Sequence, residues 1–326
     1  GRTLRVPTMA ERLKDAGGSI VYSNVSPGAA HFQDPDNHGY VYNRAGSFGP
    51  GGQPIVGDDH LNVTHDAEGD TAMTERFCQE VLGDRKPAFA VLWQCEPDHS
   101  QHSHVLGSPA HLAAIEAADV NASTVAKAVD KLNATGEDIL LLIGSDHGQE
   151  TVGDIVDLDA KLIAAGFKAH TDSSDVVVAS QGFSAFVYLA DNQRHKIADI
   201  ALYLDSLDGV GDVYAGADLE SIGQRSDGAL AIAVDAAKSD TETAYGIPGL
   251  SAAFANRVSM TLETGKGEHG GLGKYEQNPF LMAIGGGFAA GSQTDQETSA
   301  VDIAPTVLRH LDRPRDGMDG AALSRQ

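Results

Sequence analysis

The segment 96–104, with the sequence Glu-Pro-Asp-His-Ser-Gln-His-Ser-His, holds Asp98 and three histidines within nine residues. Asp98 and His102 are four residues apart, so on a helical turn their side chains share one face. Carboxylate oxygen and imidazole nitrogen are the usual non-sulfur ligands of zinc. The spacing therefore predicts that Asp98 and His102 form one half of a metal site.

Two further motifs carry side chains of the ligand type. Asp146 and His147 stand in the sequence Ser-Asp-His-Gly, and His269 stands in a glycine-rich stretch. Adjacent residues of an extended chain point to opposite faces, so Asp146 and His147 can share a metal only where the backbone turns. Gly144 and Gly148 permit such a turn. We therefore treat these two motifs as candidates for the rest of the site.

An apolar run with strand character lies beside each motif. Segment 88–93 precedes the first motif, 138–143 precedes the second, and 280–284 follows the third. We expect all three to be buried strands, and 138–143 is apolar enough to be buried on both faces. Open α/β sheets usually keep their sites beyond the ends of their strands, so we expect the three motifs at such an end.

The first part of the chain predicts one helix, one strand and a long loop. Segment 7–16 is typical of a helix with Thr8 as its N-cap, and 19–23 follows as a strand. Segment 24–66 shows no sustained periodicity and predicts mostly loop. Within it, 34–39 resembles the start of a calcium loop but lacks the closing Glu, so we interpret it as a polar turn.

Three longer segments have helical patterns. Asp70 is the expected N-cap of a helix over 70–82. The apolar residues of 109–133 have helical spacing, and 300–311 predicts a helix near the end of the chain.

Segment 151–264 differs from the rest of the chain in its order of helices and strands. It predicts a smaller α+β insertion that could cover the site. Its expected helices are 158–165 and 193–206, and its expected strands are 174–179, 184–189, 210–214 and 229–234. Residues 1–150 and 265–326 together form the predicted core. The fold class is α/β, with a mostly parallel central sheet and helices on both faces.

Composition excludes several classes of protein. The chain has 326 residues with a formal net charge of −23, and such a surface repels nucleic-acid phosphate. No run of about 18 apolar residues predicts a membrane span. Cys78 and Cys95 form no CxxC motif, which favours two buried thiols over a disulfide. We expect a cytoplasmic protein, although a periplasmic or secreted form stays open because the sequence begins without Met. The oligomeric state also stays open.

The combination of motifs resembles the alkaline phosphatase superfamily, in particular its nucleotide pyrophosphatase/phosphodiesterase and phosphonoacetate hydrolase branch. The likeness rests on Pro97-Asp98-x-x-x-His102, on Asp146-His147-Gly148 and on His269-Gly270. It extends to 7–13, which resembles the helix after the family's nucleophile region, and to 301–308 with 317–320, which resemble the last helix and tail. It therefore covers nearly the whole chain outside the insertion.

The resemblance implies a pair of zinc ions, with Mn²⁺ or Fe as other candidates. One zinc would take Asp98, His102 and His269. The second would take Asp146 and His147, together with an aspartate and a nucleophilic Thr or Ser that lie upstream of this sequence in the family. We therefore expect the chain to bind one ion tightly and the second weakly.

The function that the resemblance implies is hydrolysis of a small phosphorylated or phosphonate substrate through a phospho-enzyme on Thr or Ser. The alternatives are a non-catalytic relative that binds metal and phosphate, a phosphonoacetate hydrolase, a metal-dependent phosphomutase and a sulfatase. Within the sequence itself, Ser26, Ser47 and Thr64 are weak substitutes for the nucleophile. His99 and His104 flank the ligand loop and are expected to support the site or to face solvent.

Overall fold

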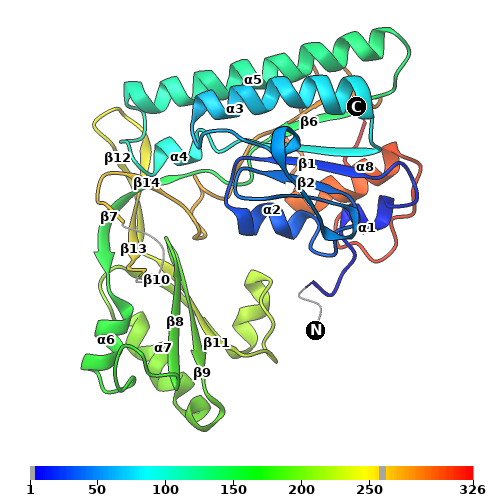
Figure 1. The fold of residues 1–326 in the computed structure, drawn as a ribbon. Coiled ribbons are helices and arrows are strands. Elements are labelled where there is room, and N and C mark those ends of the chain that lie inside the picture. The colour runs from blue at the N-terminus through cyan, green and yellow to red at the C-terminus, as the bar shows by residue number, and fades with distance from the viewer. Residues whose placement is uncertain (1–3, 257–261, 326) are drawn as a thin grey trace. The chain divides into compact units, whose positions relative to one another are not determined.

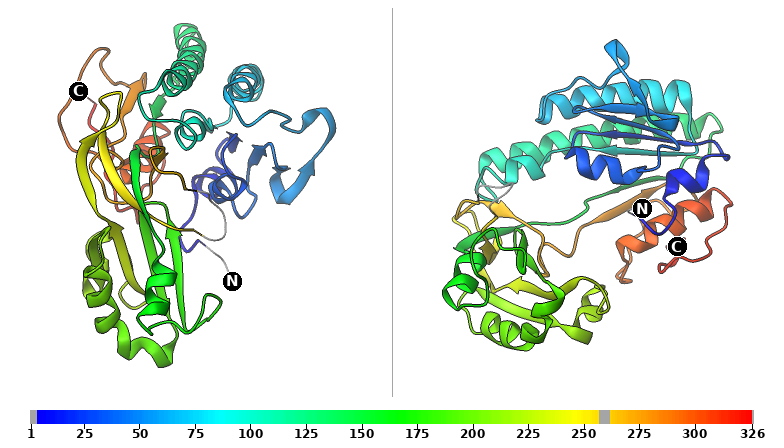
Figure 2. Two further views of the ribbon diagram at one scale, coloured as in Figure 1. Left: turned by 90° about the vertical axis from the view of Figure 1, so that its left-hand side faces the viewer. Right: turned by 60° about the horizontal axis from the view of Figure 1, so that its bottom comes forward.

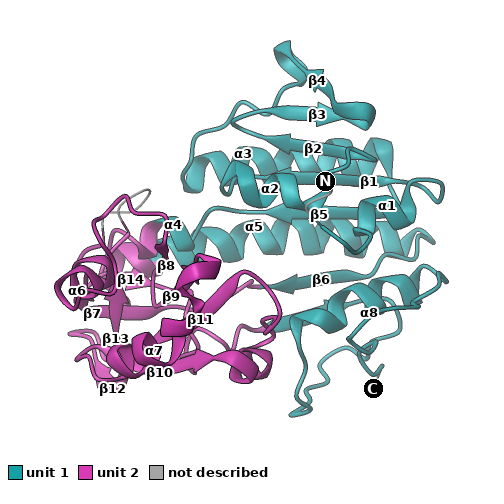
Figure 3. Cartoon of the chain, turned by 90° about the horizontal axis from the view of Figure 1, so that it is seen from below, with its two compact units in different colours: residues 1–99, 113–144, 281–326 teal, residues 100–112, 145–280 magenta. Residues whose placement is uncertain are grey.

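The computed structural model describes residues 4–256 and 262–325. These residues form two compact units, which Figure 3 shows in different colours. Unit 1 comprises Gly1–His99, Ala113–Gly144 and Leu281–Gln326, and unit 2 comprises Ser100–Leu112 and Ser145–Phe280. The division predicted from the sequence, 1–150 with 265–326 against 151–264, stays a prediction, and its residues 257–261 lie outside the described residues.

Unit 1 contains a five-stranded sheet with the order β4-β3-β2-β1-β5. Its strands are β1 (Ser19–Ser23), β2 (Tyr40–Asn43), β3 (Ser47–Gly49), β4 (Gln53–Ile55) and β5 (Phe89–Trp93). β1 pairs in parallel with both β2 and β5, whereas β3 and β4 continue the sheet in antiparallel fashion. The predicted strands 19–23 and 88–93 are therefore confirmed, but the expected burial of 88–93 is not, because every residue of β5 is only half-buried.

Helices cover both faces of this sheet, as Figures 1 and 2 show for α3 and α5 on one side and α2 on the other. The helices of unit 1 are α1 (Met9–Leu13), α2 (Pro27–Gln33), α3 (Ala67–Arg76), the π-helical continuation Phe77–Arg85, most of α5 (Pro109–Ala134) and α8 (Ile303–His310). Short 3-10 segments are Pro50–Gly52, Gly57–Asp59 and Ala300–Asp302. The helices predicted over 109–133 and 300–311 are confirmed.

The core of unit 1 follows from the alternation of side chains along β1. Ile20 and Tyr22 pack on the side of α3 and α5, in a cluster that includes Met73 and Val125. Val21 points the other way and packs against Ala30 of α2, with Val41 from β2. Because both faces of β1 are apolar, the sheet needs a helical layer on each side.

The prediction that 24–66 is mostly loop is wrong. Ser26 caps α2 by accepting a hydrogen bond from the Ala29 amide at 3.3 Å, and Pro27 fills the first turn, where its missing N–H costs nothing. The sequence Tyr-Val-Tyr-Asn then adds to the edge of β1 as β2. The predicted polar turn at 34–39 is present, with Asp34 accepting from the amides of His38 and Gly39 at 3.0 and 2.6 Å.

The predicted cap of the helix at 70–82 is also wrong. α3 begins at Ala67, and its N-cap is Asp66, whose carboxylate accepts from the Gly69 amide at 2.8 Å. Asp70 lies one turn further and is fully buried. Its carboxylate accepts hydrogen bonds from the amides of Cys95 and Glu96 instead of capping the helix.

A separate two-stranded antiparallel sheet of unit 1 consists of β6 (Leu141–Gly144) and β15 (Leu281–Ile284). The predicted strands are present, but the expected full burial is not. Phe280 and Met282 are 56% and 50% exposed, and the residues of β6 are half-buried or exposed. The reason is that each strand pairs only with the other among the described residues.

Unit 2 contains two four-stranded sheets, ordered β10-β11-β9-β8 and β12-β13-β7-β14. Their strands are β7 (Glu150–Val156), β8 (Val176–Gln181), β9 (Ser184–Leu189), β10 (Val210–Ala215), β11 (Leu230–Ala236), β12 (Lys238–Glu242), β13 (Pro248–Phe254) and β14 (Gly267–Glu268). The helices are α6 (Leu158–Ala164) and α7 (Ile197–Asp205), with 3-10 segments Asp191–Lys196 and Gly216–Ile222. The two helices and the four strands predicted here are confirmed; β7, β12, β13 and β14 were not predicted.

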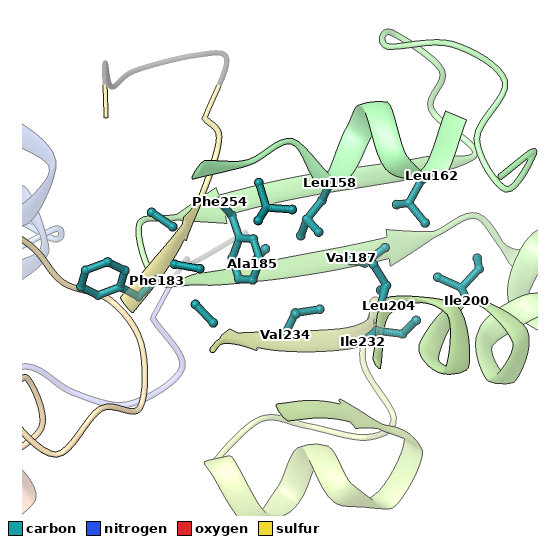
Figure 4. Packing of buried hydrophobic residues seen from close by; sticks show 14 of the residues in the cluster. Leu158, Leu162, Phe183, Ala185, Val187, Ile200, Leu204, Ile232, Val234 and Phe254 are labelled. Carbon is teal, nitrogen blue, oxygen red and sulfur yellow. The ribbon is translucent and has the colours of Figure 1, made fainter. Parts of the chain in front are cut away.

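One apolar core joins the elements of unit 2, and Figure 4 shows part of it. Ala185 from β9 packs in it with Phe183, which directly precedes β9, and with Phe254 from β13. Leu158 and Leu204 contribute from the two helices. This core fixes β7 and β13, which pair in parallel, and so fixes the loop that enters β7.

Two composition-based predictions concern the whole described chain. Both cysteines are free thiols, as predicted. Cys95 is buried as expected, whereas Cys78 is only half-buried. None of the described helices has the length and apolar character needed to cross a membrane.

Candidate metal centre

The predicted helical turn that carries Asp98 is present as α4 (Asp98–Gln101), which follows β5 after a short loop. Asp98 is its first residue, and the amide of His99 donates to the Cys95 carbonyl at 2.9 Å. His102 comes directly after the last helical residue. The two candidate ligands therefore lie one turn apart on the same piece of backbone, as their spacing predicted.

Asp70 supports the loop between β5 and α4. Its carboxylate accepts hydrogen bonds from the amides of Cys95 and Glu96 at 3.1 and 2.9 Å, and from the Asn24 side chain at 2.9 Å. Burial, which outweighs these hydrogen bonds, raises the pKa of Asp70 above its usual range. The loop just before Asp98 is thus fixed by a residue that the sequence pattern assigned to a helix cap.

Three of the predicted ligands come together within unit 2. The rings of His147 and His269 stack with their centroids 3.7 Å apart, and the ring of His102 lies 5.2 Å from that of His269. A ring nitrogen of His102 and one of His269 lie within 4.8 Å of each other. Residues more than 100 positions apart in the sequence therefore present their imidazoles to one small region.

Glu268 is a functional candidate that was not singled out from the sequence. It is buried, and its carboxylate lies 3.5 Å from Nδ1 of His102. It also accepts from the His269 amide at 3.0 Å. A carboxylate beside the second nitrogen of a metal-binding imidazole orients the ring and makes it a better ligand. Its position next to His269 in the sequence was the only available signal.

The tautomer of His147 follows from its hydrogen bond. Nδ1 lies 3.0 Å from the Gly148 carbonyl oxygen, which can only accept, so Nδ1 carries the proton in the neutral ring. Nε2 is then the nitrogen with a lone pair for a metal. Asp146 stands beside it, with a carboxylate oxygen 3.7 Å from Nε2. The backbone turn that the sequence analysis required at this motif is therefore present.

The Asp146–Gly148 turn needs a glycine at its third position. A Cβ atom at Gly148 would lie 2.1 Å from the Tyr275 carbonyl oxygen. The Gly148 amide donates to the carbonyl of Glu276 at 2.7 Å. Close backbone contact, rather than an unusual dihedral angle, explains this glycine.

The residues that could hold a metal include carboxylate as well as imidazole donors. Asp98 stands one turn before His102 in the same stretch of chain, and the family resemblance groups it with His102 and His269 as ligands of one ion. Asp146 and His147 offer a second pair of donors. Oxygen and imidazole donors of this kind suit zinc and other borderline divalent ions.

The three residues considered as substitutes for the nucleophile have structural roles. Ser26 caps α2, and the hydroxyl of Ser47 is buried and accepts from the amides of Asn43 and Leu61. Thr64 donates to Asp66 at 2.6 Å. His104 is exposed, and the ring of His99 lies 4.4 Å from that of His65.

The chain matches one known protein family. The model of the family type I phosphodiesterase / nucleotide pyrophosphatase matches residues 18–270. A search of curated proteins gave no match.

Several solved structures are similar to the chain. Human ectonucleotide pyrophosphatase / phosphodiesterase 5 has 15% identity and a TM-score of 0.59, over 95% of this chain and 71% of that one. The murine counterpart, an inactive Thr-to-Ala variant in complex with AMP, has 16% identity and a TM-score of 0.60 over the same shares. Phosphonoacetate hydrolase from Sinorhizobium meliloti 1021, in complex with phosphonoacetate, has 16% identity and a TM-score of 0.56, over 86% and 68%. These similarities confirm the predicted fold class.

Proposed function

The chain belongs to the type I phosphodiesterase / nucleotide pyrophosphatase family, and we propose that it is a phosphodiesterase that uses two zinc ions and a Thr or Ser nucleophile. The observation that carries this proposal is the convergence of the imidazoles of His102, His147 and His269 in unit 2. Such a group of neutral nitrogen donors beside carboxylates is typical of a metal centre for phosphoryl transfer.

The residues present would supply three ligands to one ion and only two to the other. In our proposal one zinc takes Asp98, His102 and His269, and the other takes Asp146 and His147. Two bound zinc ions would neutralise charge on a phosphoryl group and lower the pKa of a coordinated hydroxyl. Glu268 keeps the His102 ring in place, and the Gly148 carbonyl holds the proton of His147 on Nδ1, so that Nε2 stays available.

We assign the nucleophile to a Thr or Ser upstream of Gly1 in the full-length protein. The murine relative supports a threonine, because its Thr-to-Ala variant is described as inactive. The structural roles of Ser26, Ser47 and Thr64 argue against these three residues as replacements.

Zinc binding tests the metal centre directly. We expect this chain to bind one zinc ion tightly and a second weakly, as measured by calorimetric titration. Loss of a residue that only orients a metal ligand lowers metal affinity by at most about 100-fold. His269→Ala removes a ligand itself, so it should lower the zinc affinity of the tight site by more than that. The exposed His195 provides the matched control, His195→Ala, which should bind zinc like the wild type. Equal binding by H269A and H195A would show that the convergence of imidazoles is not a metal site.

Catalysis is tested with the full-length protein loaded with zinc. We expect turnover of an aryl phosphodiester that exceeds turnover of an aryl phosphomonoester. Zinc binding without turnover of phosphodiester, phosphomonoester or phosphonoacetate would favour a non-catalytic relative that binds phosphorylated ligands. The same assay repeated with Mn²⁺ and Fe²⁺ identifies the preferred metal.

A second candidate function is hydrolysis of a phosphonate. It is favoured by the structural similarity to phosphonoacetate hydrolase in complex with phosphonoacetate. Cleavage of phosphonoacetate at a higher kcat/KM than the aryl phosphodiester would select this candidate over the first.

A further inference from the structure

The loop that follows His269 is held by buried carboxylates from three parts of unit 2. Four consecutive or nearly consecutive amides of this loop donate to them. The amides of Gly271 and Gly273 donate to Glu276 at 2.8 and 2.9 Å. The amide of Leu272 donates to Asp235 at 2.9 Å, and that of Tyr275 donates to Glu150 at 3.4 Å. All three carboxylates are at most 5% exposed. The conformation of the His269 loop is therefore set by side chains outside the predicted ligand set.

Glu276 joins this loop to the second motif through its backbone as well as its side chain. Its side chain accepts from Gly271 and Gly273, one amide on each oxygen. Its backbone carbonyl accepts from the Gly148 amide at 2.7 Å, directly after His147. Glu276 is thus bonded to the loop of His269 and to the loop of His147 at the same time.

The space around these contacts allows little adjustment. A Cβ atom at Gly271 would lie 2.7 Å from a Glu276 carboxylate oxygen, and one at Gly148 would lie 3.2 Å from the Cα atom of Glu276. A shift of residue 276 must therefore move one loop or the other. Lys238, 3.5 Å from the Glu276 carboxylate, supplies a neighbouring positive charge.

We propose that Glu276 is a positioning residue that fixes the stacked imidazoles of His147 and His269 relative to each other for metal binding. This inference rests on the proposed function, because it assigns the two imidazoles to the metal centre. Its hydrogen bonds go to backbone amides of the two loops, so it acts through their backbone.

Both carboxylate oxygens of Glu276 are required by the geometry. The side-chain amide of a glutamine has one acceptor oxygen and one donor NH₂ group, so it can satisfy only one of the two loop amides. The other amide would then face a donor in a buried place, which is unfavourable. Glu276→Gln should therefore release one end of the loop without changing the volume of the side chain.

The experiment compares wild-type protein, Glu276→Gln and Glu276→Asp by zinc titration and by amide hydrogen exchange. E276Q should bind zinc about 10- to 100-fold more weakly, the effect typical of residues that orient metal ligands. E276D keeps two oxygens on a shorter side chain and should lie between E276Q and the wild type, which leaves a usable variant if E276Q does not fold. Exchange at Gly148 should accelerate in both variants, although the substituted side chain does not bond to that amide.

Glu80→Gln is the matched control. Glu80 is a carboxylate of unit 1 that accepts from Tyr22 at 2.5 Å and from Arg76 at 2.7 Å. E80Q should lower stability while leaving zinc affinity and Gly148 exchange unchanged.

The outcomes separate this inference from the proposed function. Unchanged zinc affinity or unchanged Gly148 exchange in folded E276Q and E276D would overturn the positioning role and leave the metal centre standing. If the wild type takes up no zinc, the metal centre itself is wrong, and the assignment of Glu276 to it falls as well. A loss of affinity in E80Q as large as in E276Q would reduce the effect to general stability and would also overturn the inference.

Discussion

The loops that carry the predicted ligands are supported in a similar way in the two units, but with different charge balance. In unit 1 the loop before Asp98 is held by one buried carboxylate, Asp70, whose partners are all neutral donors. In unit 2 the loop after His269 is held by several buried carboxylates with Lys238 beside two of them. Both supports place an acceptor where backbone amides would otherwise be buried without a partner.

The difference shows two ways to stabilise a loop that has little regular structure. A single carboxylate concentrates the support in one residue, so its loss removes several hydrogen bonds at once. A set of carboxylates distributes the support but gathers negative charge, which needs a cation nearby. The substitutions below test whether support in unit 1 is concentrated and support in unit 2 is distributed.

The largest effect is expected from Asp70→Ala. It leaves the amides of Cys95 and Glu96 without their acceptor in a buried place and removes one of the two carbonyl or carboxylate acceptors of the Asn24 side chain. Each donor left unpaired costs about 1–3 kcal/mol. The free energy of unfolding, measured by urea denaturation, should fall by about 4 kcal/mol in total. A decrease smaller than that of Lys238→Met or Ser251→Ala, which weaken the support in unit 2, would contradict the comparison.

Lys238→Met should have the next largest effect, and it should depend on pH. Burial raises the pKa of Asp235 and of Glu276, and Lys238 opposes this increase. A carboxyl with a raised folded-state pKa favours the folded protein at low pH and loses this contribution as pH rises through that pKa. Without Lys238 both pKa values rise further, so K238M should cost about 3 kcal/mol at pH 7 and less at pH 4. Urea denaturation at both pH values measures this, and an equal cost at both would show that Lys238 does not balance these carboxylates.

Ser251→Ala tests one branch of the distributed support. The hydroxyl of Ser251 donates to Glu150 at 2.8 Å, and both residues are buried. Loss of this bond should cost about 2 kcal/mol, the range for a hydrogen bond to a charged group. Zinc affinity should change less than in E276Q, because Asp235 and Glu276 still hold the loop. Affinity as low as in E276Q would mean that the support is not distributed.

Asp66→Ala should give the smallest effect and separates an exposed cap from buried Asp70 on the same helix. Loss of the N-cap should cost about 1 kcal/mol in thermal or urea unfolding. The hydrogen bonds from Thr64 and Gly69 lower the pKa of Asp66, so its contribution is present above the usual pKa of 3.8 and is lost as pH falls through the folded-state pKa. The difference between D66A and the wild type should therefore shrink in acid. A loss of stability equal to that in D70A would show that burial does not explain the larger effect expected for Asp70.

The sequence predicted the elements that bear the metal motifs because their signals are local. The apolar run before Asp98, the four-residue spacing to His102 and the apolar run before Asp146 each depend on neighbouring residues alone. The meeting of His269 with His147 could be expected only from the family resemblance, since no local pattern joins residues so far apart.

The supporting residues could not be predicted for the same reason. Asp70 has the sequence context of a helix cap, and its burial becomes visible only when the loop at Cys95 folds against α3. Glu276 follows His269 by seven residues with no repeating pattern between them. β2 was missed because four residues are too few for a period to emerge, although Tyr-Val-Tyr has clear strand propensity.

The position of Cys95 beside Asp70 has a consequence for the reactivity of the site. Thiolates are strong ligands for zinc and are easily oxidised, and Cys95 stands only three residues before Asp98. Burial, and then the neighbouring Asp70 carboxylate, raises the pKa of the Cys95 thiol well above its usual range. The thiol is therefore kept protonated and chemically inert, so a sulfur atom close to the predicted centre neither competes for the metal nor offers oxidants a point of attack.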